Sequence, residues 1–273
     1  MKYSSLKLAI SMLLLVFIIV NILWYFPWII HYWYPEVHVM NLEEGVVYVI
    51  VSDIHLWRST YEVKFIGNLC RSLNASTLII TGDLIDQRMK FTTVDDLVDL
   101  YERVIDTLGT HHINRIVHVV AATWHDIELS NSVMRLNVGG VEVLLIEGIL
   151  ILRHVRGKVY ILHGDYICRH GAIAHVINRL FNDLMVEKVG RRVLGLECSD
   201  WLIMGHTHIP GIDEESKVAN CGNWLNEDVL REMLGLKPSM TAIVLKLNKK
   251  LNVELYKLID NEWYTISTRR TKG

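Results

Sequence analysis

The chain has 273 residues, of which 51% are hydrophobic, with a net charge of −2 and a pI of about 6.7. This length suits one large domain or two small ones, and a near-neutral chain without a basic stripe argues against a nucleic-acid-binding protein. The mean hydropathy of +0.25 is high for a soluble protein, and the excess lies near the N-terminus.

The first predicted element is a long apolar helix over residues 8–30, which contain no charged side chain. At about 1.5 Å rise per residue, this run is long enough to cross a hydrocarbon core of roughly 30 Å. Aromatic residues crowd its C-terminal end, as in the belt at a lipid–water boundary; they are Trp24, Tyr25, Trp28, Tyr32, Trp33 and Tyr34. The alternatives are a buried core helix and a cleavable signal peptide. Bulky aromatics where a signal peptide has small residues favour an uncleaved anchor.

Charges flanking this run predict its orientation. Lys2 and Lys7 precede it, whereas the first charges after it are acidic: Glu36, Glu43 and Glu44. The positive-inside rule then places the N-terminus in the cytoplasm and the following domain outside it. We therefore expect a single-pass membrane anchor over residues 1–35 and a domain over residues 36–273, with the joint in YPEVHVMNLEEG.

After the joint, strand-length apolar runs alternate with helical stretches, and these segments are residues 46–53, 65–73, 77–83, 94–108 and 115–122. Buried β-branched strands separated by helices indicate an α/β architecture. Next comes a predicted hairpin around Gly139 and Gly140, followed by more strands and one helical stretch: 158–165, 172–184, 200–208, 240–248 and 251–259. The pattern predicts two packed mixed β-sheets with helices outside.

The four cysteines show no zinc-finger or CxxC spacing, so buried thiols are the default interpretation; they are Cys70, Cys168, Cys198 and Cys221. Cys198 and Cys221 could form a disulfide if the domain lies in an oxidising compartment, and the sequence does not decide this.

Five of the apolar runs end in residues that are able to bind metals. The clusters are Asp53-Ile54-His55, Gly82-Asp83, His125-Asp126, His163-Gly164-Asp165 and Gly205-His206-Thr207-His208. Each cluster alone is weak evidence, but ligand-rich loops at strand ends are where α/β sheets build their sites. Alternating Asp and His allow one carboxylate to bridge two cations, and mixed nitrogen and oxygen ligands suit Mn, Fe or Zn. Two such cations can hold a phosphate and activate a water molecule.

In this order, the clusters resemble the motifs of the calcineurin-like metallophosphoesterase superfamily over residues 46–258. HGD, GHTHIP and NCGNW also resemble the branch that contains the UDP-diacylglucosamine hydrolases. The resemblance implies a four-layer α/β sandwich of two mixed sheets flanked by helices, with two divalent transition metals.

Residue by residue, the resemblance assigns metal ligands and a catalytic pair. Asp83 would bridge the two metals. The first metal would also take Asp53, His55 and His208, and the second would also take His163 and His206. His125 would act as the general acid or stabilise the transition state, and Asp126 would orient its ring.

One position departs from the family pattern. Trp124 stands where the family has an asparagine whose carbonyl oxygen binds the second metal, and indole is only an N–H donor. Three interpretations stay open. Water or Thr123 fills the gap, or one metal binds tightly and the activity is altered or weak, or the fold binds a ligand without turnover. A loop residue packed against apolar neighbours is compatible with all three.

The expected function is that of a membrane-anchored, metal-dependent hydrolase of a phosphate ester or pyrophosphate. A phosphorylated small molecule or lipid would be the substrate, and the helical stretch between His163 and His206 could cover it, with Arg179 binding phosphate. An ordinary amphipathic helix on the sheet is the alternative. The alternative function is a degenerate phosphoesterase-fold membrane protein that binds a phosphate ligand or a partner without turnover.

Overall fold

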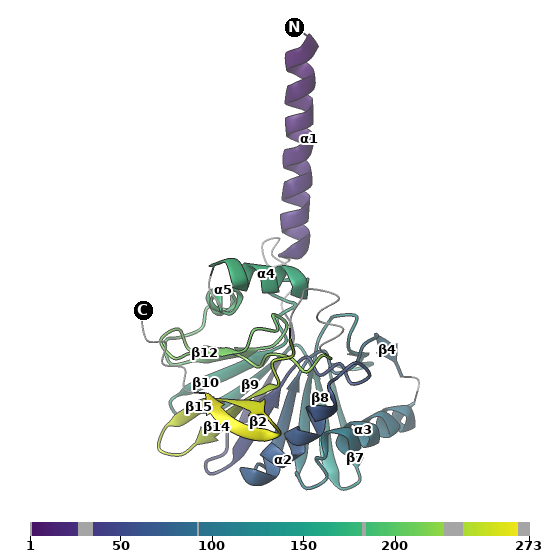
Figure 1. Cartoon of the computed structure of the whole chain (residues 1–273), viewed down its shortest axis with the longest axis vertical. Coiled ribbons are helices and arrows are strands. Elements are labelled where there is room, and N and C mark those ends of the chain that lie inside the picture. The colour runs from purple at the N-terminus through teal and green to yellow at the C-terminus, as the bar shows by residue number, and fades with distance from the viewer. Residues whose placement is uncertain (1, 27–34, 92, 182–183, 227–236, 267–273) are drawn as a thin grey trace.

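The computed structural model describes residues 2–26, 35–91, 93–181, 184–226 and 237–266 (Figure 1). Trp28, Tyr32, Trp33 and Tyr34 of the expected aromatic belt lie outside the described residues. Figure 1 shows a long N-terminal helix that rises from one end of an α/β domain.

The N-terminal helix α1 spans Lys2–Tyr25. Most of its apolar side chains from Ile10 to Val20 are exposed, and so is Trp24. The expected transmembrane helix is not found: within the described part of the chain, no helix reaches the combined length and hydropathy of a membrane span. Residues 27–30 of the expected span lie outside that part.

The larger sheet has eight strands in the order β16-β15-β14-β2-β3-β5-β8-β7. Its centre is parallel, and the flanking strands pair antiparallel. The bounds are β2 Val47–Val51, β3 Thr77–Thr81, β5 Arg115–Val120, β7 Val133–Val138, β8 Val141–Glu147, β14 Thr241–Leu247, β15 Leu251–Ile259 and β16 Glu262–Ile266. Apart from β16, which the pattern missed, these strands confirm the predicted ones, including the Gly139-Gly140 hairpin.

The smaller sheet has six strands in the order β1-β9-β10-β11-β13-β12 and is also mixed. Its strands are β1 Val37–Asn41, β9 Ile149–His154, β10 Gly157–Leu162, β11 Trp201–Met204, β12 Gly211–Asp213 and β13 Val218–Asn220. A short parallel pair, β4 Met89–Lys90 and β6 Ile127–Glu128, lies apart from both large sheets.

Helices cover the outer face of each sheet, which gives the expected four layers. On the eight-stranded sheet lie the short helix η2 Tyr61–Lys64, α2 Phe65–Ser72 and α3 Val94–Leu108. On the six-stranded sheet lie α4 Gly171–Phe181 and α5 Met185–Val193. A third apolar cluster, with residues from both sheets, fills the space between them.

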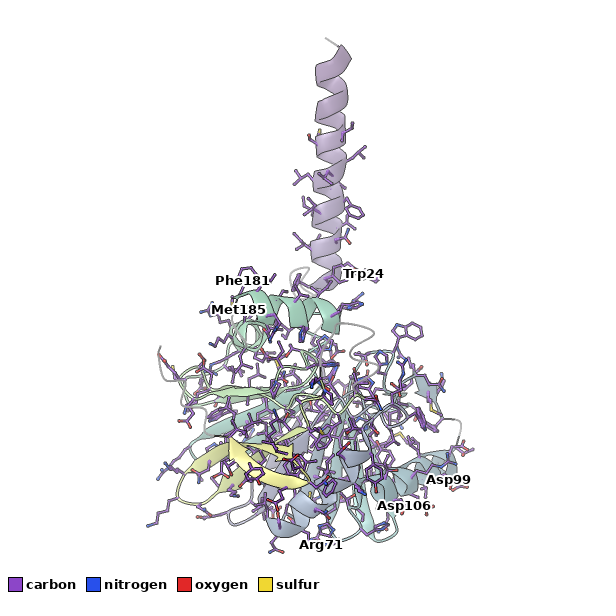
Figure 2. The ribbon with its side chains drawn as sticks, viewed as in Figure 1. Trp24, Arg71, Asp99, Asp106, Phe181 and Met185 are labelled. Carbon is purple, nitrogen blue, oxygen red and sulfur yellow. The ribbon has the colours of Figure 1, made fainter. Side chains whose placement is uncertain are left out.

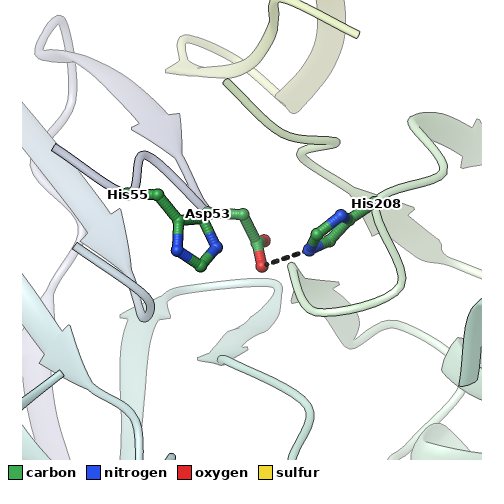
Figure 3. A group of neighbouring side chains, drawn as sticks. All are labelled: Asp53, His55 and His208. Carbon is green, nitrogen blue, oxygen red and sulfur yellow. Dashed lines mark ion pairs between the residues drawn. The ribbon is translucent and has the colours of Figure 1, made fainter. Parts of the chain in front are cut away.

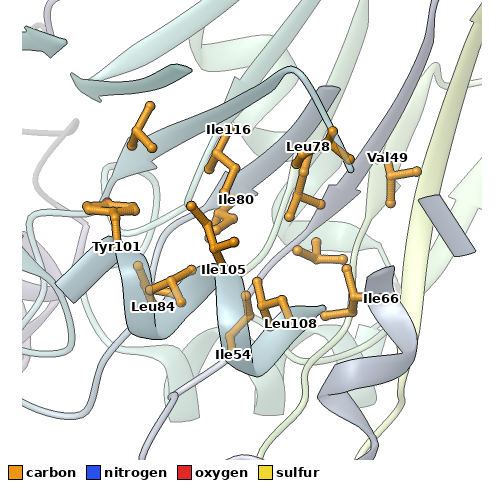
Figure 4. Close-up of a cluster of buried hydrophobic side chains, with 14 of the residues drawn as sticks. Val49, Ile54, Ile66, Leu78, Ile80, Leu84, Tyr101, Ile105, Leu108 and Ile116 are labelled. Atoms are coloured by element: carbon orange, nitrogen blue, oxygen red, sulfur yellow. The ribbon is translucent and has the colours of Figure 1, made fainter. Parts of the chain in front are cut away.

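The core under α2 and α3 explains why these helices form (Figure 4). Ile66, Ile105 and Leu108 point onto the sheet residues Leu78 and Ile80, and all five side chains are buried. Each such side chain contributes about 1.5–3 kcal/mol through burial. Thr93 begins α3 with a capping box, and Gly109 ends it in the left-handed conformation.

The structure refines three expectations about the chain. The expected joint contains strand β1, which pairs in parallel with β9 at the edge of the smaller sheet. The helical stretch after His163 forms two helices, α4 and α5, instead of one. All four cysteines are free, and three are buried as expected, whereas Cys198 is exposed and departs from the default of buried thiols.

Candidate metal centre

Both large sheets deliver side chains to one site. Strands β2 and β3 of the larger sheet end just before Asp53 and Asp83, and β5 ends shortly before His125. Strands β10 and β11 of the smaller sheet end just before His163 and the GHTH loop. Because these five strands run parallel within their sheets, their carboxyl ends gather these loops at one edge of the sandwich.

The close approach of these loops requires glycine at two positions. A Cβ on Gly205 would lie 1.7 Å from the Ser52 hydroxyl oxygen. A Cβ on Gly82, whose φ is +75°, would lie 2.4 Å from the His163 ring. The glycines of the GD and GHTH clusters thus allow the two sheets to bring their ligands together.

Asp53, His55 and His208 form the first group of candidate ligands (Figure 3). Their donor atoms all lie within 4.8 Å of one another, and His208 Nε2 is 3.1 Å from Asp53 Oδ1. The other Asp53 oxygen accepts hydrogen bonds from the Ser52 hydroxyl, at 2.5 Å, and the His206 backbone N–H, at 2.9 Å. These bonds fix the carboxylate so that Oδ1 faces the two imidazoles.

Asp83 lies between two histidines, as a bridging carboxylate would. Its Oδ1 is 3.4 Å from His163 Nε2, and its Oδ2 is 3.7 Å from His55 Nε2. Asp53, Asp83 and His163 form a second group whose donor atoms lie within 4.8 Å. The structure therefore brings together the side chains that the sequence assigned to two adjacent cations.

The rings of His163 and His206 lie in an arrangement that favours a bound cation. His163 Nδ1 lies 3.1 Å from the Thr81 carbonyl, and His206 Nε2 lies 2.6 Å from the Cys168 carbonyl. A carbonyl only accepts, so we assign the ring protons to these two nitrogens. The remaining nitrogens, His163 Nε2 and His206 Nδ1, then face each other across 3.0 Å, so a proton on one of them or a bound cation lies between the rings.

The same logic applies to His55. Its Nδ1 lies 3.2 Å from Asp86 Oδ1, while its Nε2 is buried without a hydrogen-bond partner. Asp53 Oδ1 is likewise a buried oxygen without a hydrogen-bond partner, although it faces His208. Ligating histidines usually donate their second N–H to a carbonyl or carboxylate, as these three do. The residues present thus fit divalent cations.

Buried charges shift the pKa values of the ligands. Burial opposes ionisation of Asp53, but the charges of His208 and His163 lower its pKa to about 2. Burial also opposes ionisation of Asp83, yet His163 holds its pKa well below the usual range. Burial lowers and Asp83 raises the pKa of His163, which ends well above its usual value, whereas burial and His163 lower that of His206 to about 3. Two ionised carboxylates therefore require nearby positive charge.

Five of the six candidate ligands have strained backbones. Positive φ angles occur at Asp53 (52°), His55 (48°), Asp83 (47°), His206 (68°) and His208 (60°). Such conformations cost about 1–3 kcal/mol each for residues with a side chain. Strain concentrated on one cluster of polar residues indicates a functional site rather than an ordinary part of the core.

His125 lies at the edge of the cluster, half-buried, with its ring centre 5.1 Å from that of His55. Its Nδ1 is 3.2 Å from the Asp86 backbone carbonyl. The donor atoms of His55, Asp86 and His125 form the third candidate group. Sequence analysis missed Asp86, although its position three residues after Asp83, in GDLID, was an available signal.

Asp126 has partners other than the expected one. Its carboxylate lies 3.1 Å from His118 Nε2 and accepts a hydrogen bond from the Ala121 backbone N–H at 2.9 Å. The Tyr101 hydroxyl lies 2.5 Å from the other ring nitrogen of His118. Asp126 is fully buried. It thus braces the loop that carries His125, and the orientation of the His125 ring comes from Asp86 instead.

The departure at Trp124 has a structural counterpart. Thr123 donates a hydrogen bond of 2.5 Å to Asp83 Oδ1 and accepts one from the His125 backbone N–H. Trp124 is 77% exposed, so its indole does not pack in the core. Thr123, one of the two groups expected to fill the gap, therefore lies against the bridging carboxylate.

Arg179 lies exposed near the end of α4. Its charge contributes, after burial, to a lowered pKa of His175, whose Nδ1 lies 2.8 Å from the Thr207 carbonyl. Among the described residues, Arg179 makes no direct contact with the GHTH loop.

Comparison with known proteins yields structural likenesses only. No protein-family model matches the chain, and no curated protein sequence matches it significantly. Among solved structures, YfcE, a phosphoesterase from E. coli, is 13% identical, with a TM-score of 0.39, covering 82% of this chain and 100% of its own. An archaeal phosphodiesterase is 16% identical, with a TM-score of 0.38 and coverages of 81% and 99%.

A third likeness is to a Thermotoga maritima protein with a solution NMR structure, which is 17% identical. Its TM-score is 0.32, and the match covers 78% of this chain and 99% of that one. At these scores and identities, the function has to be argued from the site itself.

Proposed function

We propose that the chain is a metal-dependent phosphoesterase that hydrolyses a phosphate ester or pyrophosphate bond. The observation that carries this proposal is the set of facing ring nitrogens and buried donor atoms without hydrogen-bond partners around Asp83. Mixed imidazole and carboxylate ligation suits Mn, Fe or Zn. Two such ions, when bound, neutralise phosphate charge and lower the pKa of a bound water molecule.

In this proposal, the candidate ligands form two sets, one for each cation. Asp53, His55 and His208 would hold one cation, His163 and His206 would hold the other, and Asp83 would contribute to both. Their fixed tautomers mean that little reorganisation is needed when the cations and a phosphate group bind.

His125 is the proposed general acid. Because the Asp86 carbonyl holds the proton on its Nδ1, the neutral ring has only a lone pair at Nε2. The doubly protonated ring can donate from Nε2 to the leaving oxygen of the substrate. Its partly open position beside the buried ligands suits contact with a substrate.

The test combines bound metal with turnover. Wild-type protein should bind two equivalents of Mn²⁺ and hydrolyse bis(p-nitrophenyl) phosphate or p-nitrophenyl phosphate. Asp83→Asn should lose both metal and activity, whereas His125→Asn should keep the metal and lose about 10²–10⁴-fold in rate. Two bound metals without turnover of any phosphoester would favour the alternative, a phosphate-binding protein of the same fold. No bound metal would overturn the metal-dependent hydrolase and would also favour that alternative.

We further propose that the chain attaches to a lipid bilayer through its apolar N-terminal segment, with the N-terminus in the cytoplasm and the domain outside it. The support is the uncharged run over residues 8–30 and the exposed apolar side chains along α1. A phosphorylated lipid is then the preferred substrate class. Resistance to carbonate extraction, together with protease digestion from each side of the membrane, tests the attachment and the orientation.

A further inference from the structure

The end of the domain that carries α1 also presents an exposed apolar surface on α4. Leu180 is 74% exposed and Phe181 is 73% exposed, and Val176, one helical turn earlier on the same face, is 46% exposed. Side chains at spacings of four residues lie on one face of a helix. Apolar side chains this exposed mark a contact surface rather than a core.

This surface is continuous with the base of α1. The Arg169 guanidinium lies 4.4 Å from the centre of the Trp24 ring, and the Arg169 backbone N–H donates to the Tyr25 carbonyl at 2.9 Å. The Tyr25 and His170 rings meet edge to face. Helix α4 begins directly afterwards, at Gly171.

The figures show the arrangement of the two helices. In Figure 1, α4 lies across the end of the domain from which α1 rises. Figure 2 labels Trp24, Phe181 and Met185 at this end and Arg71, Asp99 and Asp106 at the opposite end. A planar surface perpendicular to α1 at this end of the domain would therefore run along the length of α4.

We propose that α4 docks flat onto the lipid bilayer, with Val176, Leu180 and Phe181 in the headgroup–acyl boundary and Arg169 and Arg179 on lipid phosphates. This rests on the proposed attachment through α1, but not on the metal chemistry. The group Trp24, Arg169, Val176, Arg179, Leu180 and Phe181 is called the docking face below.

Three observations favour lipid over a protein partner. Apolar side chains of α1 are exposed around the whole helix between Ile10 and Val20, and lipid covers all sides of a helix whereas a protein covers one. Exposed Arg169 and Arg179 complement anionic headgroups. An amphipathic helix with basic residues beside its apolar face is typical of interfacial binding.

Docking would bring the metal centre under the membrane surface. His175 of α4 is bonded to the Thr207 carbonyl, between His206 and His208. A Cβ on Gly171 would lie 3.1 Å from the His206 carbonyl oxygen. The helix that meets the bilayer is thus packed directly against the loop with two candidate ligands, which suits a substrate whose phosphate lies at the headgroup level.

Environment-sensitive fluorophores on single cysteines test this proposal in the full-length chain. Cys198→Ser removes the exposed thiol, and the other three cysteines are buried. Leu180→Cys reports on the docking face, Leu14→Cys reports on α1, and Asp106→Cys is the control at the opposite end (Figure 2). The vesicles contain phosphatidylcholine with or without phosphatidylglycerol, with nitroxide-labelled lipid as the quencher.

The expected result is a blue shift and lipid-phase quenching at positions 14 and 180, with an aqueous signal at position 106. Arg179→Gln should lower the docked-to-undocked ratio on anionic vesicles about fivefold, and Arg71→Gln, at the opposite end, should leave it unchanged. A lipid signal at 14 with an aqueous one at 180 overturns the docking of α4 and leaves the attachment standing. An aqueous signal at both overturns both.

Shielding at position 180 without vesicles, increasing with protein concentration, would also overturn the proposal and point to a second copy of the chain as the occupant. Asp83→Asn serves as a further control, because it removes the proposed catalysis and should leave docking unchanged. Failure of the docking and failure of the proposed hydrolysis are therefore distinguishable.

Discussion

At the scale of single residues, backbone carbonyls prepare the candidate metal centre. The Thr81 and Cys168 carbonyls accept ring protons of His163 and His206, and this turns the other nitrogens of the two rings toward each other. Because the chain already fixes these ring orientations, a cation that enters replaces the proton that His163 otherwise holds between the two rings. Metal binding should therefore stabilise the fold as well as enable chemistry.

Asp86 gives the first prediction. Its carboxylate holds His55 Nδ1 at 3.2 Å and so aims Nε2 at the metal site. Asp86→Asn keeps the size of the side chain but offers a weaker, ambiguous partner, and Mn²⁺ affinity should fall about 10–100-fold. Titration calorimetry measures this effect, with the exposed Asp106→Asn as the control. Unchanged affinity would mean that Asp86 does not orient His55.

Thr123 and Trp124 give the second prediction. Thr123→Val removes the hydroxyl that donates to Asp83 and should weaken binding of the second Mn²⁺ about 10-fold, whereas Thr123→Ser should retain it. Trp124→Asn should strengthen second-site binding, because the new amide oxygen is a metal ligand and the exposed indole has no core role. Equal second-site affinities in all four proteins, measured by metal titration, would contradict this account.

The sequence indicated the candidate ligands but not the residues that hold those ligands in position. All six proposed ligands follow strand ends, where parallel strands bring distant loops together, so the pattern located the clusters and the family resemblance supplied the ligand assignment. Asp126 was paired with His125 because the two are adjacent in the chain. The two residues lie in a turn before β6, and Asp126 points inward to His118. Such contacts depend on packing that no local pattern encodes.

At the scale of elements, the buried Glu187 carboxylate joins α5 to three other parts of the fold. It accepts hydrogen bonds from Asn178 of α4, Thr207 of the GHTH loop and Asn220 of β13, at 2.9, 3.0 and 2.7 Å. Both helices on the smaller sheet are therefore tied to the loop that carries His206 and His208.

This carboxylate gives the third prediction. Burial raises the pKa of Glu187 from 4.5 to about 7, despite the hydrogen bonds it accepts. A pKa that is higher in the folded chain gives stability below the unfolded value, and that stability is lost as the pH rises through the folded value. The loss is about 3 kcal/mol. It should occur between the unfolded pKa of 4.5 and somewhat above pH 7.

Glu187→Gln isolates this effect because the amide does not titrate. The unfolding free energy of the wild type minus that of the variant, from denaturant melts, should fall by about 3 kcal/mol across this window. The substitution also has a cost that does not depend on pH, because the amide NH₂ lies against hydrogen-bond donors. This cost changes the free-energy difference equally at every pH and does not alter its pH dependence. A difference that does not change with pH would show that Glu187 is ionised throughout.

Some elements could not be predicted from their sequence. Strand β1 alternates between exposed and half-buried residues at a sheet edge, and the partner that makes it a strand is β9, more than a hundred residues away. Helices α4 and α5 share one apolar periodicity in the sequence, yet the structure has two helices, one ending at Phe181 and the other beginning at Met185. The internal strands, with continuous β-branched runs, were predictable because burial on both faces dictates their composition.

At the scale of the whole molecule, the candidate metal centre and the docking face are connected through α4. The candidate metal centre lies where the two sheets bring their strand ends together, and α4, which packs on its GHTH loop, also carries the docking face. We infer that attachment and catalysis are arranged so that a phosphate at the membrane surface can reach the metal centre. Detachment with detergent should therefore leave turnover of a small chromogenic phosphodiester intact while slowing turnover of a vesicle-embedded phospholipid substrate; equal slowing of both would contradict this.

The most direct test of the central claim is a crystal structure of the full chain soaked with Mn²⁺, with anomalous scattering used to locate the metal. The account predicts two anomalous peaks about 3.5–4 Å apart, on either side of Asp83. One should lie against Asp53, His55 and His208, and the other against His163 and His206. No peak at Asp83, or a single peak among His55, Asp86 and His125, would contradict the dinuclear centre.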